Sequence, residues 1–129
     1  MTIKFHKDGS LPSEDCVFVF GSNLAGRHGA GAAKAALNNF GAVYGQGFGL
    51  QGRSWAIPTK DANLRTLSLR VVENNIISFF KKITDDCYFI TRVGCGLAGH
   101  KDKDIAPMFV SRIRNNHRFS LPREWITFV

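Results

Sequence analysis

The stretch Cys16-Val17-Phe18-Val19-Phe20-Gly21-Ser22-Asn23 decides the fold that this sequence predicts. Its apolar run ends abruptly at a glycine, and more glycines follow at positions 26, 29 and 31. A short apolar run bounded by glycine is typical of a buried strand. Glycine gathers where the backbone needs positive φ or where a ligand approaches it closely. The pattern therefore predicts a buried strand that runs into a ligand-binding loop.

A second transition of the same kind occurs later in the chain. The apolar run at residues 87–93 opens into Gly94-Cys95-Gly96-Leu97-Ala98-Gly99. Ligands of open α/β sheets bind at the carboxyl ends of the strands, so we expect the two loops to lie side by side. Loop amides and free helix N-termini bind anions such as phosphate. The sequence thus predicts one anion site built from two loops.

The remaining elements follow from apolar spacing and breaker residues. We expect a helix over residues 31–40 stopped by Gly41, a flexible loop or hairpin over 44–52, a strand over 54–58 ended by Pro58, a helix over 64–82, a strand over 87–93, a helix capped by Asp102 or Asp104 and running to about Asn115, and a last strand over 125–129. Strands that alternate with helices indicate an α/β sheet covered on both faces.

Length and composition bound the class of protein. The chain has 129 residues, of which 44% are hydrophobic, and this favours a single domain over residues 1–129. No apolar stretch approaches the roughly 20 residues of a membrane helix, and residues 1–7 lack the apolar core of a secretory signal. Three cysteines without a C-x-x-C spacing argue against a disulfide framework or a zinc site. We therefore expect a cytoplasmic protein without metal or cofactor.

The net charge of +7 has two interpretations. It favours attraction to polyanions or anionic nucleotides, or it reflects a basic bias that serves solubility. The cations are spread along the chain rather than gathered in a tract with exposed aromatic residues. A small anionic ligand is therefore the expected partner, and nucleic acid and membrane are not.

Three side chains near the predicted loops carry alternative interpretations. Asn23 either caps its own turn or contacts a ribose hydroxyl. Lys60, followed by Asp61 at a strand end, is either an exposed turn residue or a cation that faces phosphate or acts as a nucleophile. Cys95 is either a small residue that fits between two glycines or an acidified thiol. His28 and His100 stand at the loop edges without the spacing of a metal site.

These motifs resemble the macrodomain family of ADP-ribose binders. Phe18-Val19-Phe20-Gly21-Ser22-Asn23, followed by Gly29-Ala30-Gly31-Ala32-Ala33, is similar to the first macrodomain loop. Arg92-Val93-Gly94-Cys95-Gly96-Leu97-Ala98-Gly99 is similar to the second loop, which wraps the diphosphate, and is nearest to the branch that removes ADP-ribose from acidic side chains. Thr59-Lys60 stands where that branch carries its catalytic lysine. The chain is also similar to short phage and bacterial macrodomain-like proteins.

The resemblance implies a three-layer α/β/α fold with a central mixed sheet and a site for ADP-ribose or a related nucleotide. It assigns ligand binding to Gly21, Ser22, Asn23, Gly29, Ala30, Gly31, Gly94, Cys95, Gly96, Leu97, Ala98 and Gly99. It also makes an ADP-ribosylated protein a further partner.

One departure from the family pattern weakens the case for catalysis. The hydrolase branch has a catalytic aspartate where this chain has Ala98, and by sequence the only nearby substitutes for that carboxylate are Asp61, which follows Lys60, and Asp102. Binding is therefore the expected function. The alternatives are an ADP-ribosyl hydrolase that uses Lys60, a phage protein that sequesters an ADP-ribose-derived immune signal in the host cytoplasm, and nucleic-acid binding through net charge.

Overall fold

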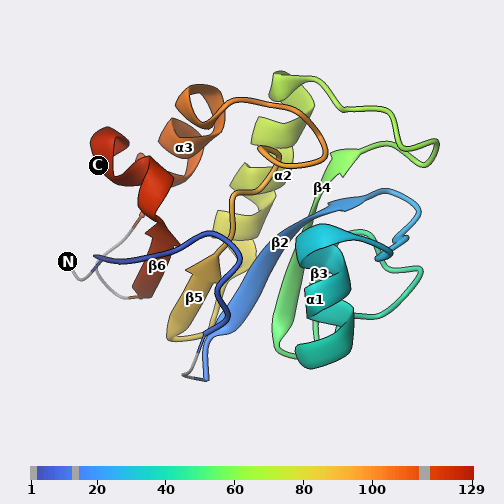
Figure 1. Cartoon of the computed structure of the whole chain (residues 1–129), viewed down its shortest axis with the longest axis horizontal. Coiled ribbons are helices and arrows are strands. Elements are labelled where there is room, and N and C mark those ends of the chain that lie inside the picture. The colour runs from blue at the N-terminus through green and yellow to red at the C-terminus, as the bar shows by residue number, and fades with distance from the viewer. Residues whose placement is uncertain (1–2, 13–14, 114–116) are drawn as a thin grey trace.

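One mixed sheet organises the computed structural model, which describes residues 3–12, 15–113 and 117–129. Its strands lie in the order β1-β6-β5-β2-β4-β3 (Figure 1), and every neighbouring pair is parallel except β3 with β4. The strands are β1 (Ile3–His6), β2 (Val17–Asn23), β3 (Gly49–Gln51), β4 (Ser54–Lys60), β5 (Cys87–Ile90) and β6 (Arg118–Pro122). The helices are α1 (Gly31–Asn39), α2 (Leu69–Lys82), α3 (Asp102–Val110) and the 3-10 helix η1 (Arg123–Phe128).

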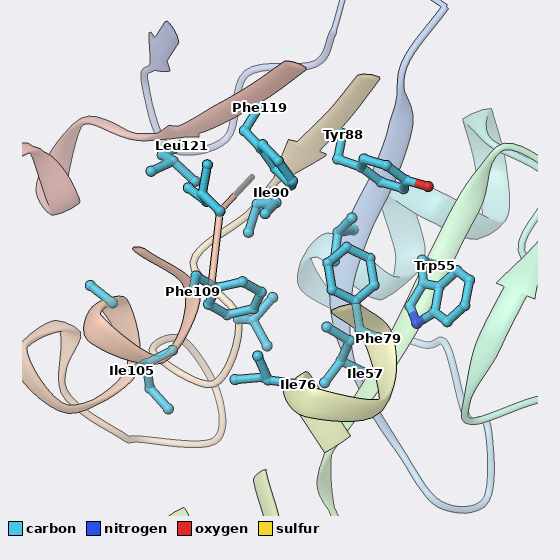
Figure 2. Close-up of a cluster of buried hydrophobic side chains, with 14 of the residues drawn as sticks. Trp55, Ile57, Ile76, Phe79, Tyr88, Ile90, Ile105, Phe109, Phe119 and Leu121 are labelled. Atoms are coloured by element: carbon cyan, nitrogen blue, oxygen red, sulfur yellow. The ribbon is translucent and has the colours of Figure 1, made fainter. Parts of the chain in front are cut away.

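Alternation along β2 divides the interior into two layers. Val17 and Val19 join a cluster with residues of α2, α3 and η1, whereas Phe18 and Phe20 join a smaller cluster with residues of α1. Successive side chains of a strand point to opposite faces, so an unbroken apolar strand must be covered on both sides. Figure 2 shows the larger layer, in which Phe79 and Phe109 lie beside Ile76 and Ile57. The predicted α/β architecture with helices on both faces is confirmed.

Three predicted element boundaries are wrong. β4 passes through Pro58 to Lys60, because β3 pairs only with Ser54–Ala56 and a proline beyond it removes no bond to β3. α2 begins at Leu69 rather than residue 64, since the Ser68 hydroxyl accepts a hydrogen bond from the Val71 amide. β5 ends at Ile90 rather than residue 93.

The C-terminal prediction is also wrong. The strand is β6, and residues 123–128 form η1 instead of the expected strand over 125–129. Trp125 is completely buried, and its indole N–H donates to Asp102 at 2.7 Å, which anchors this turn on α3. Neither β1 nor β6 was predicted from the sequence. The predicted helix after residue 102 is present as α3, begins at Asp102 and ends at Val110; its predicted end at Asn115 lies outside the described residues.

The segment over residues 44–52, expected as a flexible loop or hairpin, is a turn followed by β3, which forms a hairpin with β4, and it contacts the first glycine loop. Its last residues form β3, and the Gly45 amide donates to the Gly26 carbonyl at 2.8 Å. The Ser22 hydroxyl donates to the Gly47 carbonyl. A Cβ at Gly47 would overlap the Asn23 carbonyl, so only glycine allows this approach. The chain that leads into this hairpin therefore holds the backbone of the first glycine loop.

A disulfide between Cys16 and Cys87 contradicts the expectation that the cysteines would not pair. The two residues precede or begin the neighbouring strands β2 and β5, whose pairing starts at Val17 and Tyr88. Parallel pairing therefore brought together two sulfurs that are 71 residues apart in sequence. Disulfides are rare in the cytosol of mesophiles, and the cytoplasmic location stays a prediction. Among the described residues, no helix is both long and apolar enough to span a membrane.

Reducing the Cys16–Cys87 bond is expected to lower the free energy of unfolding by about 2–4 kcal/mol, because the unfolded chain regains loop entropy. Urea denaturation of the parent with and without reductant measures the change, and the Cys16→Ser/Cys87→Ser variant should match the reduced parent. Cys95→Ala should keep the reductant effect. Equal stability in both redox states would show that the bond is absent in solution.

Candidate functional site

The carboxyl ends of β2, β4 and β5 open into a cleft of about 740 Å³. Both glycine loops contribute to its wall, as expected from parallel pairing. The predicted residues that line it are Gly21, Ser22, Asn23, Gly29, Ala30, Gly31, Lys60, Gly94, Gly96, Leu97 and Ala98. Cys95 and Gly99 belong to the second loop but do not line the cleft.

The second loop presents unpaired amides at this cleft. The Cys95 amide donates to the Arg92 carbonyl at 3.0 Å, and the His100 amide donates to the Gly94 carbonyl at 2.8 Å. Within the described residues, the amides of Gly94, Gly96, Leu97 and Ala98 donate to no protein acceptor. Gly94 has φ +77°, which turns the chain sharply after β5. The loop therefore offers four backbone donors from residues that line the cleft.

α1 adds a second set of donors. It starts at Gly31, and no side chain caps it at Ala30. Its first turn contains no acidic residue. The first amides of a helix have no partner within the helix, and the helix dipole makes this end positive. Because Ala30, Gly31 and Ala32 line the cleft, this end of α1 is oriented for an anion.

Asn23 holds the first loop in shape. Its Oδ1 accepts a hydrogen bond from the Arg27 amide at 2.9 Å, and its Nδ2 donates to the Arg27 carbonyl at 3.0 Å. The turn-capping interpretation therefore describes its contacts in this structure. A primary amide carries two protons, so one Nδ2–H remains for a ligand.

His28 is a buried support rather than a cleft residue. Its Nε2 lies 3.0 Å from the Gln46 carbonyl and 3.2 Å from Gln51 Oε1, both of which are acceptors, so Nε2 donates. His100 likewise holds the backbone, through its Nε2 at 2.8 Å from the Leu67 carbonyl. Among the described residues, no group of three or more His, Cys, Asp or Glu side chains could hold a metal ion.

Lys60 ends β4 beside Asn23 and lines the cleft. Asp61 and Asp102, the two carboxylates that the sequence offered in place of the missing catalytic aspartate, make other contacts. Asp61 Oδ1 accepts from the amides of Asn63 and Arg65 at 2.9 and 3.0 Å and so shapes a turn. Asp102 does not line the cleft, and its carboxylate pairs with Arg92.

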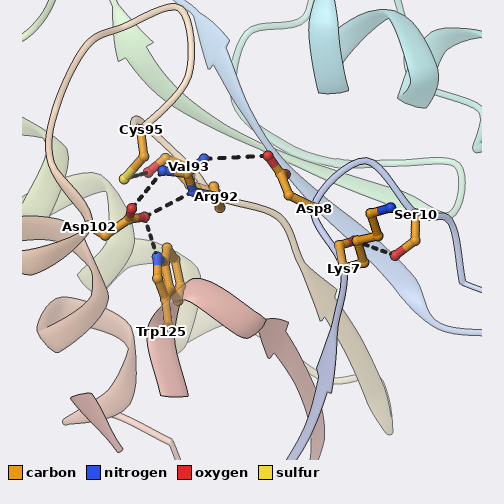
Figure 3. A network of polar contacts seen from close by, with 8 residues as sticks. All are labelled: Lys7, Asp8, Ser10, Arg92, Val93, Cys95, Asp102 and Trp125. Atoms are coloured by element: carbon orange, nitrogen blue, oxygen red, sulfur yellow. Dashed lines mark hydrogen bonds and ion pairs between the residues drawn. The ribbon is translucent and has the colours of Figure 1, made fainter. Parts of the chain in front are cut away.

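Figure 3 shows that Arg92 stands between two carboxylates. Its Nε and Nη2 donate to Asp102 at 3.0 and 2.6 Å, and its Nη1 donates to Asp8 at 3.4 Å. The Arg92 guanidinium, with the indole N–H of Trp125, holds the pKa of Asp102 below its usual value. Asp102 is therefore ionised at neutral pH and cannot serve as a proton donor there.

Several residues that line the cleft were not found from the sequence: His6, Asp8, Arg27, Thr59, Leu64, Thr91 and Arg92. His6 and Asp8 enter through β1 and the loop after it, an element that sequence analysis missed. Burial lowers the pKa of His6 to about 4, so its ring is neutral at pH 7. Leu64 has φ +64°, a strained conformation for leucine that nothing in the sequence indicated.

Comparisons with known proteins agree with this architecture. No protein-family model and no curated protein matches the sequence. Among solved structures, the chain is similar to the macrodomain of Mycobacterium tuberculosis DarG, with a TM-score of 0.65 over 94% of this chain and 97% of that chain.

This chain has a macrodomain fold. The three-layer fold that the loop motifs implied is thus confirmed. The sequence identity is 16%, so the likeness extends to the arrangement of the elements and not to individual residues. In this chain the cleft lies at the strand ends where both glycine loops meet.

Cys95 is expected to be unreactive in the folded protein. Burial, with the nearby Asp102 carboxylate, raises the pKa of its thiol to about 12, and Sγ points to the Val93 carbonyl at 3.6 Å. Iodoacetamide at about pH 8, near the ordinary thiol pKa, should modify Cys95 only after denaturation, as measured by mass spectrometry. Rapid modification of the native parent would instead support the interpretation of Cys95 as an acidified thiol.

Proposed function

We propose that this chain binds ADP-ribose or a related ADP-ribosyl nucleotide in the cleft. The observation that carries the proposal is the convergence of the unpaired amides of Gly94, Gly96, Leu97 and Ala98 with the uncapped N-terminus of α1. A diphosphate matches both sets of donors, because each can hold one anionic group without a charged side chain. The cleft volume of about 740 Å³ is within the usual range for small-molecule sites.

Charge near the cleft supports an anionic ligand of small size. Arg27 and Lys60 line it as cations, whereas the charge of Arg92 is balanced by Asp102 and Asp8. The ligand would thus meet mainly neutral donors and two flanking cations. Ser22 and Asn23 line the cleft at the end of β2, and the second Nδ2–H of Asn23 would be the donor for a ribose hydroxyl.

Calorimetric titration with ADP-ribose should show saturable binding at ligand concentrations below about 1 mM, a standard free energy beyond about −4.1 kcal/mol. Gly96→Val is the informative variant. A Cβ at Gly96 would meet no atom within 4 Å and its φ is not positive, so the fold tolerates it while the side chain occupies the cleft. Its affinity should fall at least about tenfold, or about 1.4 kcal/mol.

Ala62→Val is the matched control, because Ala62 is exposed and does not line the cleft. Titrations at about 50 and about 200 mM salt separate a small ligand held by neutral amides from nucleic acid, whose affinity falls steeply with salt. Absence of heat up to millimolar ADP-ribose in the parent would refute the proposed function. A steeply salt-dependent affinity for DNA or RNA, without ADP-ribose binding, would favour the polyanion alternative.

ADP-ribosyl hydrolysis through Lys60 is a second candidate, because Lys60 lines the cleft beside Asn23. Asp61 and Asp102 are committed to other contacts, so no assisting carboxylate comes from either. We therefore expect binding with little or no turnover. Tight binding without turnover is also what the sequestering alternative requires.

Incubation with a protein ADP-ribosylated on glutamate tests the hydrolase candidate. The expected result is no release of ADP-ribose by the parent or by Lys60→Ala, measured by chromatography. Lys60→Ala should still bind ADP-ribose, with affinity reduced about tenfold or less through the loss of one cation. Release by the parent but not by Lys60→Ala would establish the enzyme and contradict this expectation.

A further inference from the structure

Asp102 lies outside the cleft but holds the side chain of Arg92, which lines the cleft. It does not belong to the lining, whereas Arg92 does. Both oxygens of the Asp102 carboxylate accept hydrogen bonds from Arg92, at 3.0 and 2.6 Å. The two side chains are only 27% and 23% exposed, so solvent screens this pair less than a surface pair. A bidentate contact of this kind fixes the orientation of the guanidinium as well as its position.

Arg92 in turn joins two walls of the cleft. Its backbone carbonyl accepts from the Cys95 amide at 3.0 Å, at the start of the second loop. Its Nη1 donates to Asp8, which follows β1 and lines the cleft from the N-terminal segment. The Asp8 side chain is 50% exposed and the contact is 3.4 Å long, so this ion pair by itself contributes little. This weak contact forms only while Arg92 is held in this position.

Asp102 is anchored from the interior. The indole N–H of Trp125 donates to its Oδ1 at 2.7 Å, and Trp125 is completely buried. The Trp125 ring stacks on Phe109 of α3 at 5.3 Å between ring centroids. Figure 3 shows the resulting series, in which Trp125, Asp102, Arg92 and Asp8 follow one another. A rigid core residue is thereby connected with the N-terminal wall of the cleft.

We propose that Asp102 is a positioning residue for the cleft, which sets the N-terminal segment and the second glycine loop in place through Arg92. The inference rests on the proposed function, since the geometry that Asp102 maintains is that of the ADP-ribose site. The four amides of the second loop must point to one ligand at once. A loop that can shift at Arg92 loses that arrangement, although none of the amides is altered.

Asp102→Asn is the variant that tests this role, since it keeps the shape but weakens the bidentate pair. Asp104→Asn is the matched control, because Asp104 is also in the first turn of α3 and makes no contact with Arg92. Amide hydrogen exchange of the ligand-free proteins should be faster in Asp102→Asn at the hydrogen-bonded amides of the two segments, which are Ser10 in the N-terminal segment and Cys95, Gly99 and His100 in and after the second loop. Exchange in α2, and the urea midpoint, serve as references for global stability.

The expected result is faster exchange at both segments in Asp102→Asn and at neither in Asp104→Asn. Unchanged exchange in Asp102→Asn overturns the proposal. Faster exchange that is uniform, and matched by a fall in the urea midpoint, also overturns it, because it indicates only a structural role. These outcomes do not depend on ligand binding, so they remain decisive if the parent fails to bind ADP-ribose.

Titration with ADP-ribose provides the second readout. Asp102→Asn should bind about tenfold more weakly than the parent, the effect of losing one charge-assisted hydrogen bond. Trp125→Phe, which removes the donor but keeps an aromatic ring, should show a smaller loss, and Asp104→Asn none. If the parent binds and Asp102→Asn binds equally well, the positioning role is wrong and the proposed function stands.

The two tryptophans supply an internal control in the same titration. The Trp125 indole N–H contacts Asp102, whereas the Trp55 indole N–H is buried in the core under α2 and has no hydrogen-bond partner among the described residues. ADP-ribose should shift the Trp125 indole resonance in a ¹H–¹⁵N spectrum of the parent and leave that of Trp55 in place. The Trp125 shift should disappear in Asp102→Asn. A shift that persists there overturns the series through Arg92.

Discussion

Parallel pairing of β2 with both β4 and β5 is the constraint on which the site depends. Three strands that run in the same direction must end at the same edge, so their loops meet there whatever their distance in sequence. Lys60 and Asn23 become neighbours in this way, and Gly94 comes close to Gly21. At the opposite edge the same pairing brings Cys16 and Cys87 together, and their disulfide links the two strands that carry the glycine loops. The apolar side chains of β2 point alternately to the two covered faces of the sheet, and their packing keeps this arrangement in place.

Backbone and side chains have different roles at the cleft. Unpaired amides of the second loop and of the start of α1 are the donors that the proposed anionic ligand would meet. The polar side chains nearby mostly hold the backbone: Asn23 closes its own turn, His28 and Ser22 fasten the hairpin, and Arg92 joins the second loop to Asp8. A site whose donors are amides depends on its supports more than on any single contact, because an amide cannot reorient without moving the chain. The supports include residues outside the lining, since Asp102 holds Arg92 and Trp125 holds Asp102.

Several sequence predictions failed for identifiable physical reasons. Apolar spacing placed a helix from residue 64, but a turn held by Asp61 and the Ser68 cap delay it to Leu69. Pro58 suggested a strand end, yet the short β3 leaves its side of β4 unpaired there. The last residues have strand-like composition, but Trp125 anchors them on α3 as a 3-10 turn. At the C-terminus a contact between segments 23 residues apart outweighed the local preference, whereas turn and capping contacts within four residues set the start of α2. β1 and β6 were missed because their runs are short and interrupted by polar residues.

The sequence by itself determined the two strand-to-glycine transitions, the alternation of strands with helices, and most of the loop residues that line the cleft. These are local properties: a buried strand needs an apolar run, and a sharp turn or an exposed amide ridge needs glycine. Only the tertiary structure decided that Cys95 and Gly99 lie outside the lining, that Asp61 and Asp102 are engaged, and that Cys16 meets Cys87. It also brought Asp8 and Arg92 together across 84 residues of sequence. Such pairings follow from strand order and register, and no short stretch of sequence contains them.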